Sequence, residues 1–113
     1  MTDIVMAIKL PRIIKEYVDA SNRHDLKSIL SCFSDDALVH DEGKEFPGKK
    51  SIEGWIEKTI EKYKFRFRPL NVRDGGAEVV VAVEVSGTFD GSPVTLDYHF
   101  SIANDKILSL SVR

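Results

Sequence analysis

The sequence predicts an α+β domain in which three helices pack on a strongly curved, mainly antiparallel sheet and enclose an apolar pocket. In residues 13–33 and 52–63, apolar residues recur three and four positions apart, which is the period of amphipathic helices. From Lys64 the period changes to two, which is typical of half-buried strands. Turn-forming residues at 74–76, 90–91 and 104–105 separate the alternating runs. Helices followed by consecutive strands indicate this fold class.

The length and the net charge of the chain limit the number of domains and the kinds of partner that we expect. A chain of 113 residues predicts one domain, 1–113, large enough to bury a core without a metal or a disulfide. The 16 basic and 18 acidic residues give a net charge of -2, so we expect no nucleic-acid partner and no anionic membrane partner. No apolar run approaches the roughly 20 residues of a membrane span, and no secretion signal is recognisable at the N-terminus. We therefore expect a cytoplasmic protein.

The first helix is predicted to begin near Pro11, a residue that suits the first helical turn. Its inward stripe consists of residues spaced four apart in two pairs: Ile13, Ile14, Tyr17 and Val18. Residues 1–10 are apolar but have no clean period. Three roles stay open for them: extending the helix, covering the pocket or touching a partner subunit.

A second, short helix is expected after a break at Asn22–Arg23, with Asp25 as its N-cap. Its apolar face has the helical spacing i, i+3, i+4, i+7: Leu26, Ile29, Leu30 and Phe33. Cys32, the single cysteine, falls within this helix and is expected to be a buried structural thiol.

The first strand follows an acidic turn at residues 34–36. Ala37, Val39 and Asp41 share one side of this strand because side chains alternate between faces. A longer turn then leads through Phe46–Gly48 into the third helix, whose inward stripe is Ile52, Trp55, Ile56, Thr59, Ile60 and Tyr63.

Four further strands are predicted after Lys64. In the first, Phe65 and Phe67 alternate with a basic row that we expect to face solvent and to pair with Glu78 or Glu84: Lys64, Arg66 and Arg68. Pro69 predicts a bulge, a bend or an edge position, because proline cannot donate a ladder hydrogen bond. The other strands span 77–89, 94–102 and 107–112.

Two segments, FSDDALVHD at 33–41 and FPGKKSIEGW at 46–55, resemble the NTF2-like superfamily in its SnoaL-like and ketosteroid isomerase-like branch. The likeness extends from about Pro11 to the end of the chain. It implies a cone-shaped, cystatin-like domain with a mixed, mainly antiparallel sheet around a central pocket. Many such proteins keep the scaffold without the chemistry, so the resemblance is more specific for fold than for activity.

The resemblance also implies three site residues. Asp41 matches the position of the general base, and Tyr17 matches a tyrosine that donates a hydrogen bond to an enolate oxygen. The family's second acid directly precedes a His-Phe pair; here Tyr98 takes that place and Asp97 stands one residue earlier. Because strand side chains alternate, Asp97 is expected to point out of the pocket and Tyr98 into it. The expected pocket walls are Phe33, Val39, Trp55, Phe65 and Phe100.

Each candidate also has a purely structural interpretation. Tyr17 suits a core position with a satisfied hydroxyl, Asp41 suits a solvated turn, and Tyr98 suits a pocket wall without a chemical role. The three histidines lack the spacing of metal ligands, and no nucleotide or flavin fingerprint is present. We expect no cofactor and no metal.

Three functions remain open at this point. The first is a cofactor-free isomerase or polyketide-cyclase-like enzyme that moves a proton on a small hydrophobic carbonyl compound. The second is a non-catalytic module that binds a lipophilic molecule in the same pocket. The third is a protein-interaction domain. In each case a homodimer through the polar outer face of the sheet is expected.

Overall fold

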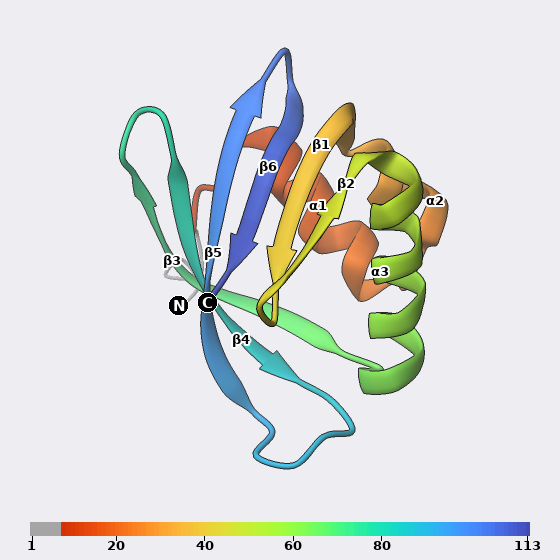
Figure 1. Cartoon of the computed structure of the whole chain (residues 1–113). Helices are drawn as coiled ribbons and strands as arrows, with labels where there is room; N and C mark the ends of the chain where they lie inside the picture. The colour runs from red at the N-terminus through yellow and green to blue at the C-terminus, as the bar shows by residue number, and fades with distance from the viewer. Residues whose placement is uncertain (1–7) are drawn as a thin grey trace.

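The computed structural model describes residues 8–113 and shows helices packed on one mixed six-stranded sheet (Figure 1). The helices are α1 (Arg12–Asn22), α2 (Leu26–Ser31) and α3 (Gly48–Tyr63). The strands are β1 (Phe33–Asp41), β2 (Lys44–Pro47), β3 (Arg66–Asp74), β4 (Val79–Ser86), β5 (Val94–Ala103) and β6 (Lys106–Val112). The predicted α+β class and its three helices are confirmed. No helix within residues 8–113 is both long and apolar enough to cross a membrane.

The strand order is β2-β1-β6-β5-β4-β3. The pair β1–β6 is parallel, and the other neighbours run antiparallel. Helix α3 packs on β1 and β2, while α1 packs on β3 and β6, so the sheet curves around the helices (Figure 1). The pocket described below lies inside this curve.

Helix α1 turns the predicted stripe toward the sheet, with Ile14 fully buried and Tyr17 only 3% exposed. The Tyr17 ring makes edge-on contacts with Phe33 and Phe100, at centroid distances of 5.9 and 5.6 Å. Such contacts fix the ring direction as well as burying apolar area. The first helix thus holds a phenol inside the domain.

Helix α2 is shorter than predicted. Asp25 is its N-cap as expected and accepts a hydrogen bond from the Ser28 backbone nitrogen at 3.2 Å. The helix ends at Ser31, so Cys32, buried as predicted, follows the helix, and Phe33 already belongs to β1. Pairing with β6 explains the difference, because the Ile107 backbone nitrogen donates to the Cys32 carbonyl oxygen at 2.8 Å.

The acidic segment 34–36 was expected to be a turn but continues β1, with a register shift against β6 between Phe33 and Leu38. Residues 44–47, also expected within a turn, form β2 and pair with β1. The true turn is Glu42–Gly43, where both residues have positive φ angles, +54° and +75°. This tight hairpin makes Asp41 the last residue of β1 and directs it to the end of the pocket.

The strands after α3 follow the predicted alternation. Pro69 lies in the edge strand β3, next to a register shift between Pro69 and Asn71, so an edge position and a bulge occur together. Of the basic row, Arg68 pairs across to β4 as expected, with its Nε atom 3.0 Å from Glu84 Oε1, whereas Lys64 precedes β3 as the C-cap of α3. This pair is largely solvent-exposed and contributes at most about 1 kcal/mol to folding.

Candidate functional site

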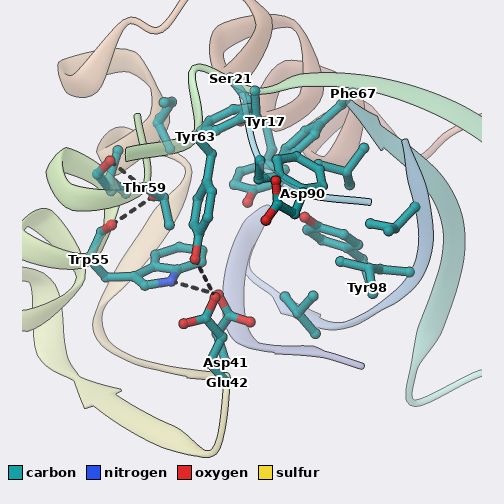
Figure 2. Close-up of a pocket in the computed structure, with 18 residues that line it drawn as sticks. Tyr17, Ser21, Asp41, Glu42, Trp55, Thr59, Tyr63, Phe67, Asp90 and Tyr98 are labelled. Atoms are coloured by element: carbon teal, nitrogen blue, oxygen red, sulfur yellow. Dashed lines mark hydrogen bonds between the residues drawn. The ribbon is translucent and has the colours of Figure 1, made fainter. Parts of the chain in front are cut away.

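A cavity of about 290 Å³ lies between α1, α3 and the inner face of the sheet (Figure 2). This volume is at the lower end of the range for small-molecule sites. Its lining is mostly aromatic and aliphatic: Tyr17, Ser21, Ile29, Asp41, Glu42, Trp55, Ile56, Thr59, Tyr63, Phe65, Phe67, Val85, Phe89, Asp90, Val94, Leu96, Tyr98 and Val112. A few polar groups in an otherwise apolar hollow are what a binding site for a small hydrophobic molecule requires.

Two tyrosines reach the cavity from opposite elements, Tyr17 from α1 and Tyr98 from β5. Their side chains are 3% and 6% exposed. Burial raises the pKa of both phenols, and the negative charge of Asp41 raises each pKa further. Both hydroxyls therefore stay protonated at neutral pH and can donate a hydrogen bond to a ligand oxygen.

Asp41 is held in the cavity wall by α3. The Trp55 indole nitrogen donates a hydrogen bond to Asp41 Oδ2 at 3.0 Å (Figure 2). Burial raises the pKa of the Asp41 carboxyl above its ordinary value, and the Trp55 hydrogen bond acts in the opposite direction. A carboxylate with a raised pKa is a stronger base than a solvated one, and a positioned base needs this property.

Four residues line the mouth of the cavity: Glu42 and Asp90 are exposed, and Tyr63 and Phe89 are half-buried. The Tyr63 hydroxyl donates to Glu42 Oε2 at 2.8 Å, which ties the end of α3 to the β1–β2 turn (Figure 2). The Phe89 ring contacts the Tyr63 ring edge-on at 5.7 Å. Asp90 belongs to the segment between β4 and β5.

The structure brings together five of the residues singled out in the sequence. Tyr17, Asp41, Trp55, Phe65 and Tyr98 all line the cavity. As alternation requires, Asp97 lies on the other side of the sheet from its neighbour Tyr98, with its carboxylate 3.8 Å from Arg73 Nη2.

Three expected wall residues lie elsewhere. Phe33, Val39 and Phe100 are at most 1% exposed and belong to the solid core rather than to the cavity lining. The rings of Phe33 and Phe100 pack against Tyr17. An inward direction on a strand predicted the burial of these residues correctly. The Tyr17 ring, which packs on Phe33 and Phe100, takes a position in the cavity wall instead.

The sequence did not predict the acidic residues at the mouth of the cavity. Glu42 and Asp90 were assigned to turns, and turn residues are solvated by default. No sequence pattern marked Glu42, whose positive φ angle is seen only in the folded chain. Nothing local distinguished Asp90. Within residues 8–113, no three His, Cys, Asp or Glu side chains cluster closely enough to hold a metal ion.

The fold is of the NTF2-like, cystatin-like class, and the cavity inside it has the lining that is typical of a small-molecule site. Residues 14–110 match the sequence family of SnoaL-like domains, and the chain belongs to this family. No curated protein sequence matches the chain significantly.

Solved structures agree with this assignment. A protein from Sinorhizobium meliloti, described provisionally as a polyketide cyclase, is 35% identical, with a TM-score of 0.89 over 92% of this chain and 95% of its own. A ketosteroid isomerase-like protein from Catenulispora acidiphila, in complex with trimethylamine, is 17% identical, with a TM-score of 0.81 over 93% and 86% of the two chains. Rv0760c from Mycobacterium tuberculosis, in complex with estradiol-17β-hemisuccinate, is 13% identical, with a TM-score of 0.76 over 89% of each chain. The last two similarities establish the fold alone.

Proposed function

We propose that this protein binds a small hydrophobic carbonyl compound and moves a proton on it without a cofactor, with Asp41 as the general base. The observation that carries the proposal is the position of Asp41. Its carboxylate lies in an apolar cavity, hydrogen-bonded by Trp55 and close enough to Tyr17 and Tyr98 to affect the pKa of both phenols. A base and two neutral donors in one cavity are the groups that enolisation requires.

The proposed step begins with proton transfer from the carbon next to the carbonyl to the Asp41 carboxylate. The electrons of the broken C–H bond form a carbon–carbon double bond, and the carbonyl oxygen gains negative charge. Tyr17 and Tyr98 donate hydrogen bonds to this oxygen, which stabilises the enolate. Where the enolate is conjugated with a second double bond, return of the proton from Asp41 to the far carbon gives an isomerase. Attack of the enolate carbon on a second carbonyl of the substrate, whose oxygen then takes the proton from Asp41, gives a cyclase.

Comparison with relatives supports this substrate class. The 35% identical protein from Sinorhizobium meliloti carries the provisional description of a polyketide cyclase, and such an enzyme acts on carbonyl compounds. Rv0760c holds a steroid derivative within the same fold. Both point to hydrophobic molecules as ligands of this scaffold.

Non-catalytic binding of a lipophilic molecule is the second candidate, and one feature of the cavity favours it. Tyr98 occupies the place where the isomerases of this branch have their second acid. A phenol whose pKa is raised by burial donates a weaker hydrogen bond than a protonated carboxyl group. Such a pocket could hold a carbonyl compound without activating it.

The deciding experiment compares wild type with Asp41→Asn. Exchange of the proton next to the carbonyl is followed by NMR in D2O over a panel of hydrophobic ketones. Quenching of Trp55, the single tryptophan, reports binding. We expect exchange to fall about 100-fold or more in Asp41→Asn while binding persists, because asparagine still accepts the Trp55 hydrogen bond.

Asp97→Asn is the matched control, since Asp97 is outside the cavity, and we expect it to exchange at the wild-type rate. Undiminished exchange in Asp41→Asn would end the catalytic assignment. Binding without exchange in the wild type would select the second candidate.

We further propose that the protein is a homodimer joined through the outer face of the sheet. Polar groups on this face support a wet contact: the Arg73–Asp97 pair, and His99, whose Nδ1 atom lies 3.4 Å from Glu78 Oε1. Sedimentation at micromolar concentration should give twice the mass of the chain. A monomer under these conditions would contradict the proposal.

A further inference from the structure

The charge of the cavity lining has one sign. Three carboxylates contribute to the lining, Asp41, Glu42 and Asp90, and no lysine, arginine or histidine does. An anionic ligand would therefore meet repulsion without a compensating cation, in a setting where apolar walls reduce screening. A positively charged group would meet attraction from the same residues.

The mouth combines this charge with aromatic rings. Tyr63 and Phe89 stand beside Glu42 and Asp90, and aromatic faces attract cations through their quadrupole. The chain shows this attraction itself: the Lys62 ammonium lies 5.1 Å from the centre of the Tyr63 ring. Lys62 is exposed and does not belong to the cavity lining, so its charge lies beside the mouth and outside the cavity.

The inner end of the pocket suits a ligand oxygen rather than a positive charge. Tyr98 is 6% exposed and lines the cavity, and its hydroxyl has no hydrogen-bond partner among residues 8–113. A hydroxyl that faces the cavity without a protein partner is free to donate a hydrogen bond to a ligand oxygen. The inner end therefore fits a carbonyl, and the mouth fits a cation.

We infer that the pocket selects its ligand by charge and takes a hydrophobic amino ketone. The carbonyl lies at the inner end, and the ammonium group lies at the mouth near Glu42 and Asp90. Compounds that present a carboxylate at the mouth are excluded. This inference rests on the proposed function only in using the same pocket, since charge selection does not require Asp41 to act as a base.

The test uses three unreactive probes that share one compact, non-fluorescent skeleton: 1-adamantanemethylamine, 1-adamantanemethanol and 1-adamantanecarboxylate. None has an enolisable carbonyl, so turnover plays no part. Binding to the full chain is measured by Trp55 fluorescence and by calorimetry at low and high salt. We expect the amine to bind tightest and the carboxylate weakest, with a ratio of about tenfold or more that shrinks as salt rises.

Two variants test whether Glu42 and Asp90 cause the preference for the amine. Glu42→Gln and Asp90→Asn should each weaken amine binding about two- to fivefold and leave alcohol binding unchanged, as expected for partly exposed charge pairs. Glutamine at position 42 still accepts the Tyr63 hydrogen bond. Glu45→Gln is the matched control, because Glu45 is an exposed carboxylate of β2 outside the cavity, and it should change neither affinity.

Equal affinities for the three probes, or tightest binding of the carboxylate, would overturn the charge inference and leave the proposed proton transfer standing. An equal loss of amine binding in Glu45→Gln would overturn it as well. Failure of all three probes to bind while the ketones still exchange would overturn the charge inference alone. Failure of the probes and of the ketone panel together would contradict the proposed function as well.

Discussion

The inner end of the pocket and its mouth contain the same types of side chain, yet the two regions are suited to different tasks. Each has carboxyl and phenol groups: the half-buried Asp41 with the buried Tyr17 and Tyr98 inside, and the exposed Asp90 with the Tyr63–Glu42 pair at the mouth. Burial raises the pKa of all three inner groups, whereas both mouth carboxylates are exposed. Solvation, rather than residue type, separates a chemical role from a recognition role.

The largest expected difference between the two regions is in stability. Phe100→Ala removes a ring that is 1% exposed and packs against Tyr17, so the free energy of unfolding should fall by about 3–5 kcal/mol. Phe89→Ala at the mouth removes a partly exposed ring, so the free energy of unfolding should fall by clearly less than in Phe100→Ala. Urea unfolding of both variants measures the difference, and equal losses would show that the mouth is as tightly packed as the core.

The second largest expected effect is the loss of catalytic rate when a hydrogen-bond donor at the inner end is removed. Tyr17→Phe and Tyr98→Phe each remove one hydroxyl aimed at the proposed enolate oxygen, so kcat for proton exchange should fall about 100-fold. Tyr63→Phe removes a hydroxyl bonded to Glu42 at the mouth and should leave kcat within about threefold of wild type. If the mouth variant lost as much kcat as the inner variants, the division of the pocket would be wrong.

A smaller expected effect is a shift in the pKa of Asp41, the proposed base. The Trp55 hydrogen bond lowers the pKa of Asp41 against the effect of burial, so Trp55→Phe should move the pKa of the pH–rate profile upward. Ser51→Ala, a substitution on the same helix outside the cavity lining, serves as the control and should not move the profile. A downward shift in Trp55→Phe would mean that the hydrogen bond does not favour the charged form.

The smallest effect is on the pH dependence of stability. The pKa of Asp41 is raised in the folded state, so the folded protein binds more protons than the unfolded chain between the ordinary value of 3.8 and the raised value. Stability contributed by this group therefore falls as pH rises through that window. Thermal melts of Asp41→Asn should show a weaker decline than wild type there, and parallel curves would argue against burial of the carboxyl.

The sequence was sufficient for most of the fold, because helical and strand periods are strong in this chain. The α1 stripe, the alternation of β4 and β5 and the Asp25 cap all followed from local pattern. Strand β2 and the early start of β1 did not, since pairing with β1 and β6 decides them and no local signal records such pairing.

The site was only partly predictable for a related reason. Alternation indicates which side chains point inward, as it did for Tyr98, but it does not indicate which of them reach the cavity surface. Phe33 and Phe100 point inward and are covered by Tyr17. Asp90 reaches the pocket from a turn, where periodicity makes no prediction.

The most direct test is the pH dependence of proton exchange on a bound ketone, measured by NMR for wild type and Asp41→Asn. The account predicts that exchange in wild type rises with pH to a plateau, with a midpoint above the ordinary aspartate value of 3.8, and that this rise is absent in the variant. A flat wild-type profile, or the same rise in Asp41→Asn, would contradict the claim that Asp41 is the base.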